Sequence, residues 1–343
     1  MSDLGYSNMH KMLKDFLCDL QRSAANLGVP GISSGFSPLD RLTGGFENGK
    51  LYVIGGRPGI GREEFMLSMI RYIALIDDLP TLLFSTNYQK KDYVERLVSI
   101  SYHIPASQLW MDNPLWSQID EAIGDAPLFI HDSLDLPLDE LVETARNCIS
   151  EEGIKIIFID CLQMIDFAKE DGNSTERIAK VMLSLKQLAR QNDVPIVVGS
   201  MLNRGVEHQD GIEGKRPQLK DLANSGYIEE LSDVIMMVHR PEYYHIYENE
   251  HGQDLRGFME IVLRKNSLKP LSSVSMNYHQ ETGDVTLRDC TSKTVSKPVS
   301  LKDFGTDNRA VGKLVKALDL EEEPMEEACV EIVLDQGIGD YSR

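Results

Sequence analysis

The chain has 343 residues, of which 42% are hydrophobic and 26% are charged, and its formal net charge is −19. These values are typical of a globular protein with one large domain or two smaller ones. The acidic balance disfavours strong non-specific binding to nucleic acid, which needs clustered lysine and arginine. No apolar run reaches the roughly 18 residues of a membrane helix, so we expect no membrane partner and a cytoplasmic location.

The first predicted element is an amphipathic helix that ends before Gly28. Its apolar residues recur with helical spacing; they are Met9, Met12, Leu13, Phe16, Leu17 and Leu20. This stripe can pack on its own domain or on a neighbouring subunit, and both alternatives stay open.

From residue 50 onward, apolar or β-branched runs alternate with helical stretches. We predict strands at 51–56, 81–86, 127–132, 154–160, 195–201, 233–240 and 257–265, and then a hairpin around 281–283. We predict helices at 62–76, 90–104, 138–152 and 175–191. Buried strands separated by helices indicate an α/β fold with a mainly parallel, twisted sheet and helices on both faces. After about residue 303 we expect a short helix at 310–320 and a flexible acidic tail.

The stretch GGRPGIGREEF (55–65) follows the first strand and opens the next helix. Gly56 and Gly61 have the spacing of the phosphate-loop pattern G-x-x-x-x-G-K-S/T, but Arg62 and Glu63 stand where lysine and a hydroxyl residue belong. The strand–turn–helix context favours a phosphate-binding loop over a ligand-free glycine turn. The nucleotide-binding candidates are Gly56, Arg57, Gly59, Gly61, Arg62 and Glu63.

A second phosphate-site signal is the apolar strand that ends in Asp160. An acidic residue in this place fits a Walker B element, whose carboxylate holds Mg²⁺. Asp160 is therefore the candidate metal ligand, if nucleotide binds.

Over about residues 8–290 the chain resembles the C-terminal motor domain of DnaB-type replicative DNA helicases, which are hexameric RecA-fold ATPases. Five stretches carry the likeness in the family's order: GISSGFSPLDRLTGG, FSTNYQKKDYVERL, IFIDCLQMI, the run from STERIAK to SMLNRGVE, and KRPQLKDLANSGYIEELSD. The resemblance implies a RecA-like P-loop NTPase fold, ATP and Mg²⁺ as cofactors, and a homo-oligomer such as a hexameric ring. It also implies single-stranded DNA or replication proteins as partners.

The resemblance further implies a domain plan in which the family's N-terminal helical domain is absent. We expect a linker helix over 1–30, a RecA-like core over 31–300 and an acidic extension over 301–343.

Carried over position by position, the family's catalytic set is altered at five places. Lysine is replaced by Arg62, the metal-binding hydroxyl by Glu63, the general-base glutamate by Asn87, the γ-phosphate-sensing glutamine by Met201, and the arginine given to the neighbour's ATP by Ser267. Asp160, Gln163 and Lys265 match the family. Because a general base contributes about 10² to 10⁴ in rate and an arginine finger about 10³ to 10⁵, we expect weak or absent ATP hydrolysis.

Whether the chain binds nucleotide stays open. The altered loop is consistent with binding of ATP and Mg²⁺ and also with binding of neither. We hypothesise that Glu63 or Glu64 occupies the phosphate position, paired with Arg62 or Arg57, because a helix N-terminus stabilises a carboxylate.

The loops that face DNA in RecA-type rings correspond to residues 166–175 and 207–218. The first is acidic, and the second offers only Lys215 and Arg216 as weak DNA-binding candidates. Three functions remain: a DnaB-like scaffold or regulator in DNA replication or mobile-element biology, a working helicase with unusual residues, and a non-replicative interaction protein that keeps only the fold.

Overall fold

The computed structural model describes residues 9–14, 17, 29–110, 123–166, 174–223, 225–267 and 270–288. Of the predicted N-terminal helix, residues 9–14 and Leu17 are helical and exposed. The predicted helix at 310–320, the acidic extension and most of the loop at 166–175 lie outside the described residues. Within the described ranges, no helix combines the length and the apolarity needed to cross a membrane.

The centre of the fold is a nine-stranded sheet, counted over the described residues, in the order β3-β2-β4-β5-β1-β6-β7-β8-β9. The first six strands in this order are parallel and the last three are antiparallel. The strands are β1 (Leu51–Gly56), β2 (Thr81–Ser85), β3 (Leu128–Asp132), β4 (Ile156–Ile159), β5 (Ile196–Met201), β6 (Val234–His239), β7 (Phe258–Asn266), β8 (Ser273–His279) and β9 (Asp284–Leu287).

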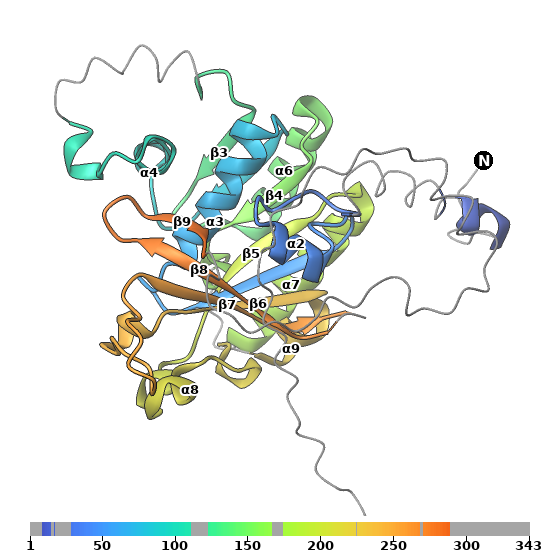
Figure 1. Ribbon diagram of the computed structural model, residues 1–343. Coiled ribbons are helices and arrows are strands. Elements are labelled where there is room, and N and C mark those ends of the chain that lie inside the picture. The colour runs from blue at the N-terminus through green and yellow to red at the C-terminus, as the bar shows by residue number, and fades with distance from the viewer. Residues whose placement is uncertain are drawn as a thin grey trace, which may run out of the picture. The chain divides into compact units, whose positions relative to one another are not determined.

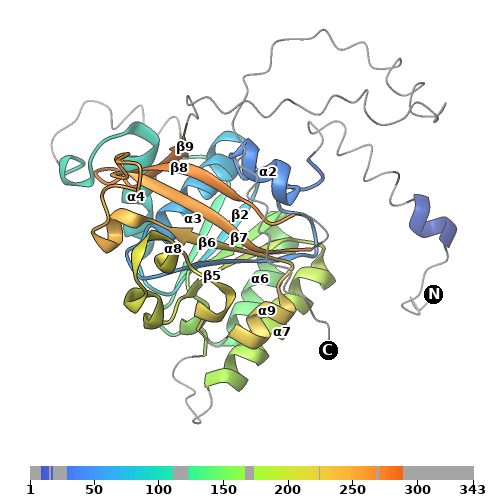
Figure 2. The same ribbon diagram turned by 60° about the horizontal axis from the view of Figure 1, so that its bottom comes forward.

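Helices cover both faces of this sheet, as predicted. Figures 1 and 2 show α2, α3 and α4 on one face and α6, α7 and α9 on the other, and each face has its own hydrophobic core. The α-helices are α2 (Ser37–Thr43), α3 (Arg62–Ile70), α4 (Lys90–Tyr102), α6 (Leu138–Glu152), α7 (Ser174–Asn192), α8 (Gly211–Lys215) and α9 (Ser225–Leu231). Short 3₁₀ turns lie at η2 (Ala106–Gln108), η3 (Leu162–Met164), η4 (Arg204–His208), η5 (Leu219–Asp221) and η6 (Pro241–Tyr244).

One predicted helix changes character along its length. The helix expected over 62–76 is α-helical only to Ile70 and continues as a π-helix, η1 (Arg71–Ile76). At its end the N–H of Asp77 bonds to the carbonyl of Tyr72, five residues back. The spacing of apolar residues does not distinguish an α-helix from a π-helix, because both bury one face. In η1 the buried residues are Ile73 and Ala74.

The carboxyl ends of β1, β2, β4 and β5 meet at one edge of the sheet. The register pairs Gly56 with Met201 and Ile159 with Val198, so the segments that follow these strands are neighbours. At this edge β5 passes very close to β4: a Cβ on Gly199 would stand 2.2 Å from the carbonyl oxygen of Asp160. The fold therefore brings the phosphate loop and the Asp160 segment together.

Candidate functional site

The phosphate loop joins β1 to α3 and depends on two glycines. Gly59 and Gly61 have φ values of +75° and +107°, which side chains with a Cβ rarely adopt. A Cβ on Gly61 would also stand 2.4 Å from the terminal methyl of Met259. The first backbone N–H groups of a helix have no partner within the helix, and α3 begins directly after Gly61 with no side-chain cap. The loop thus keeps the backbone form of an anion cradle.

Contacts with other segments hold the loop in place. Nε of Arg57 donates to Glu207 at 2.6 Å, and its Nη1 donates to the carbonyl of Leu202 at 2.7 Å. The hydroxyl of Tyr243 donates to the carbonyl of Pro58 at 3.1 Å. Arg57 is therefore engaged with η4, and it is not the partner of Glu63 or Glu64.

Arg62, at the lysine position, is almost fully buried, with 3% of its side chain exposed. Its Nη2 donates to Oε1 of Glu63 at 2.8 Å, so two adjacent residues of the loop form an ion pair. Nε and Nη1 of Arg62 are buried and have no hydrogen-bond partner among the described residues. The ion pair thus satisfies one nitrogen of the guanidinium and leaves the other two buried and unpaired.

Glu63, at the hydroxyl position, has its second oxygen occupied as well. The hydroxyl of Tyr88 donates to Oε2 of Glu63 at 3.2 Å. Arg96 stacks on the Tyr88 ring, 4.0 Å from its centre. Burial, and next the charge of Glu63, raise the pKa of Tyr88, so this hydroxyl keeps its proton and remains a donor at neutral pH. The partners of Glu63 are therefore Arg62 and Tyr88, not the amides of the loop.

Asp160, at the Walker B position, is 2% exposed and lies in a ring of neutral donors from the end of β2 and from α4. Oδ1 accepts from the N–H and the hydroxyl of Thr86, at 3.0 and 2.7 Å. Oδ2 accepts from the hydroxyls of Ser85 and Tyr93, at 3.1 and 3.0 Å, and from the N–H groups of Thr86 and Asn87, at 3.0 and 3.2 Å. This carboxylate fixes β2 against β4.

The other predicted residues of this edge lie beside Asp160. Asn87 follows β2, and its backbone N–H reaches Asp160. Gln163, in the η3 turn after β4, bonds to the end of β5. Its Nε2 donates to the hydroxyl of Ser200 at 3.0 Å, and its Oε1 accepts from the N–H of Met201 at 3.0 Å. The structure thus places Asn87, Gln163 and Met201 around one edge, together with the loop.

Lys265 and Ser267 lie at the opposite edge of the sheet. Lys265 pairs in register with Ile235, near the start of β6, whereas the loop follows the end of β1, which is parallel to β6. Nζ of Lys265 donates to the carbonyl of Glu229 at 2.6 Å, and Oγ of Ser267 donates to the carbonyl of Asp233 at 2.9 Å. These two residues are remote from the loop of their own chain.

The two DNA-binding candidates make contacts inside the protein. Arg216 forms a two-pronged pair with Glu260 on β7, at 3.0 and 2.6 Å, and the Arg216 side chain is only 19% exposed. Nζ of Lys215 donates to the carbonyl of Glu207 at 2.5 Å. Their charges are thus directed into the fold.

Beside this pair lies His239, the last residue of β6, which is opposite Glu260 in the sheet and stacked on Tyr244. Burial lowers the pKa of His239 to about 4, against about 6.5 in an unfolded chain. Below pH 6.5 the unfolded state binds the proton and the folded state does not. We therefore expect folding stability to fall between about pH 6.5 and 4, with His239 contributing about 3 kcal/mol of that loss.

Urea unfolding at a series of pH values checks this expectation. His239→Phe keeps an aromatic ring in the site and removes the titration, so its stability should depend less on pH over this range. The same change at the exposed His279 is the matched control and should leave the pH dependence as in the wild type. An identical pH dependence in His239→Phe and wild type would show that His239 is not the group responsible.

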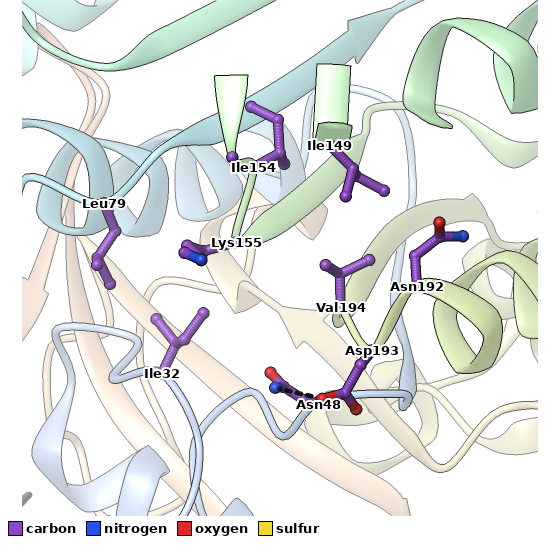
Figure 3. Close-up of a pocket in the computed structure, with 10 residues that line it drawn as sticks. Ile32, Asn48, Leu79, Ile149, Ile154, Lys155, Asn192, Asp193 and Val194 are labelled. Carbon is purple, nitrogen blue, oxygen red and sulfur yellow. Dashed lines mark hydrogen bonds between the residues drawn. The ribbon is translucent and has the colours of Figure 1, made fainter. Parts of the chain in front are cut away.

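A cavity of about 420 Å³ opens at the amino edge of the sheet, away from the loop (Figure 3). Apolar side chains that precede β2, β4 and β5 line it, including Leu79, Ile154 and Val194. Nδ2 of Asn48 donates to Asp193 across it at 3.2 Å. The predicted site residues of the loop and of the Asp160 segment are not among those that line this cavity.

The sequence that forms this sheet and loop matches a known family. A model of the DnaB-like helicase C-terminal domain matches residues 31–286. The chain belongs to the DnaB-like helicase family.

Replicative DNA helicase DnaB of Leifsonia xyli subsp. xyli is 31% identical over 256 residues, which cover 73% of this chain and 54% of that protein. The DnaB of Pasteurella multocida is 31% identical over 268 residues, which cover 76% of this chain and 56% of that protein. This DnaB-like chain therefore spans little more than half the length of these curated relatives.

Solved structures agree with the family. One solved ATPase domain has a TM-score of 0.73 and 26% identity, covering 83% of this chain and 100% of that domain. A DnaB-like replicative helicase, described with its interactions with primase, has a TM-score of 0.66 and 28% identity, covering 75% of this chain and 63% of that one. The predicted RecA-like fold and the family resemblance are confirmed.

The DnaB-like fold implies Mg²⁺ beside a bound nucleotide, and the side chains present here do not fit that ion. The hydroxyl that binds Mg²⁺ in phosphate loops is replaced by a carboxylate already bonded to Arg62 and Tyr88. Asp160 already accepts six contacts from protein donors, more than the roughly four lone-pair sites of a carboxylate. Within the described ranges, no three His, Cys, Asp or Glu side chains converge as metal ligands.

Family motifs did not identify Tyr88 and Tyr93, which hold the two carboxylates of the DnaB-like site. Tyr88 follows the altered base position directly, and Tyr93 lies one helical turn into α4. The available sequence signal was one tyrosine directly after Asn87 and another six residues after it, and such tyrosines are too common to indicate a contact without the fold.

Proposed function

We propose that this chain is a DnaB-like protein that has lost ATP hydrolysis and acts as a scaffold or regulator in DNA replication or mobile-element biology. The observation that carries the proposal is the Arg62–Glu63 ion pair in the phosphate loop. It replaces a lysine free to reach phosphate with a neutral pair. The amide of Asn87, at the base position, cannot take the proton of an attacking water.

We propose a ring of copies as the working form. Lys265 and Ser267 lie across the sheet from the loop, so any contact they make with a nucleotide must involve the loop of another copy. The described part of the N-terminal helix exposes Met9, Met12 and Leu13, an apolar surface that a neighbouring core could cover. In this plan residues 1–30 are the connector, 31–300 the core and 301–343 an acidic extension.

The partner class we propose is replication proteins, with single-stranded DNA as the second candidate. The names of the relatives support the first choice, because they are replicative helicases and one is described together with primase. The intramolecular pairing of Arg216 weakens the case for DNA.

Unwinding of a forked DNA substrate with ATP and Mg²⁺ tests the proposed function, with a working DnaB-type helicase as the positive control. We expect no unwinding by this chain. Strand separation at a rate like that of the control would establish instead a working helicase with unusual residues.

Light scattering tests the ring. The full chain should have the mass of a ring, and a variant without residues 1–28 should dissociate. A full chain with the mass of one copy would contradict the ring, and an intact oligomer after the deletion would show that the helix is not the connector.

A further inference from the structure

The cavity at the amino edge of the sheet has mainly apolar walls (Figure 3). Its base consists of residues that precede β2, β4 and β5, and its sides come from the carboxyl ends of α6 and α7 and from the segments on either side of α2. Three wall residues are only half-buried and expose apolar surface; they are Ile32, Leu79 and Ile149. The volume of about 420 Å³ is in the range of binding pockets.

One charged side chain at this cavity is available to a partner. Lys155 directly precedes β4 and is exposed, and its amine makes no hydrogen bond or ion pair with another described residue. Asp193, by contrast, already accepts a hydrogen bond from Nδ2 of Asn48 at 3.2 Å. The cavity therefore fits an apolar segment that carries a carboxylate at its border.

The N-terminal helix supplies such a segment. Its described residues expose four apolar side chains, Met9 at 74%, Met12 at 47%, Leu13 at 51% and Leu17 at 50%. Positions 9, 12, 13 and 17 share one face of a helix, and an exposed apolar patch of this kind marks an interaction site. Asp15 and Asp19 follow Met12 by three and seven residues, so helical spacing predicts both carboxylates beside the apolar face.

The chain enters the core at the rim of the cavity. Residues 18–28 join the helix to Val29, and Ile32, a wall residue, follows three residues later. Two backbone hydrogen bonds with Phe46, at 2.9 and 2.8 Å, fix Ile32 in place. Even fully extended, a linker of this length reaches only about 40 Å. It therefore holds the helix near the cavity at a high effective concentration, an advantage that a separate copy lacks.

We propose that, in a copy outside the ring, the cavity seats the apolar face of that copy's own N-terminal helix, with Asp15 or Asp19 paired with Lys155. This inference rests on the proposed function, in which the same helix connects neighbouring copies. It deepens that function by naming a competing seat, because a helix held in its own core must leave before it reaches a neighbour. Copies then join only at concentrations that outcompete the tether.

Photo-crosslinking of the full chain locates the helix. The photo-reactive residue p-benzoylphenylalanine replaces Leu13, and the chain is diluted until light scattering gives the mass of one copy, irradiated, and digested for mass spectrometry. We expect crosslinks within one chain to residues of the cavity, such as Ile149. The same probe at Lys11, two residues earlier and on the other side of the helix, is the matched control and should give no crosslink to the cavity.

Trypsin cleavage at the same dilution tests the seat without a probe. Cleavage after Lys14 requires the helix to leave the cavity, so its rate follows the open fraction. Lys155→Glu sets a like charge against Asp15 and Asp19 and should raise this rate by about threefold, a change on the scale of one exposed ion pair. Lys220→Glu makes the same charge change at an exposed residue of η5, at the carboxyl edge of the sheet, and should leave the rate as in the wild type.

Four results would overturn the inference. Crosslinks from position 13 that form only between chains, or that miss the cavity in a chain whose circular dichroism shows it folded, are two of them. The third is an equal cleavage rate in wild type and Lys155→Glu. The fourth is a ring that persists at nanomolar concentration, since no copy then lies outside it. All four leave the proposed loss of hydrolysis standing, which fails separately through DNA unwinding.

Discussion

The triple substitution Arg62→Lys, Glu63→Thr, Asn87→Glu is expected to raise ATP hydrolysis by about 100-fold over the double substitution at residues 62 and 63, because a general base contributes about 10² to 10⁴ in rate. The first two changes remove the ion pair and provide the lysine and hydroxyl that phosphate and Mg²⁺ need. The third provides the base. Release of inorganic phosphate from saturating ATP and Mg²⁺ measures the effect.

The matched control moves one of these changes by a single position. A variant with Arg62→Lys, Glu64→Thr and Asn87→Glu keeps Glu63 and should stay at the rate of the wild type, because the groups of a catalytic site act as a unit. If the triple substitution folds and hydrolyses no faster than this control, the lost chemistry does not lie in these three positions.

The second large effect is on stability. Asp160→Asn is expected to lower the free energy of unfolding by about 3 kcal/mol or more, because the new amide places donors against the buried donors of Ser85, Thr86 and Tyr93. If Asp160 only bound a metal and did not stabilise the fold, Asp160→Asn would keep the free energy of unfolding and lose metal binding. Urea unfolding of wild type and variant, followed by circular dichroism, measures the difference.

Asp78→Asn is the control for this substitution. Asp78 is exposed and has a φ of +52°, a conformation that asparagine also adopts, so the same chemical change should leave stability within about 0.5 kcal/mol of the wild type. If Asp160→Asn also stays within that range, the ring of donors around Asp160 does not hold β2 against β4 in the way described.

The strands could be predicted from the sequence because their signal is local. A buried parallel strand needs only a short run of apolar or β-branched residues between turns, and the predicted strand at 51–56 has the bounds of β1. The strand order could not be derived in this way. It depends on which strands pair across the chain, as when β1 lies between β5 and β6. The family resemblance implied a RecA-like fold, and no strand order was predicted.

For the site, too, the sequence predicted which residues take part but not most of their contacts. Motif positions located Arg62, Asn87 and Asp160, since these residues follow recognisable strands. The contacts that define their present state are non-local: the donors of Ser85, Thr86 and Tyr93 are 67 to 75 residues from Asp160 in the sequence. The pairing of Glu63 with Arg62 was predictable because the two are adjacent, whereas the hydroxyl of Tyr88 needed the fold.

Our central proposal is that a RecA-like core of the DnaB-like family persists here without its hydrolytic chemistry. Phosphate release by the purified wild-type chain, at saturating ATP and Mg²⁺ with single-stranded DNA, tests it most directly. We predict a rate equal to that of buffer alone and no stimulation by DNA. DNA-stimulated turnover at about 1 per second or faster, the lower end of ordinary enzyme rates, would contradict the proposal.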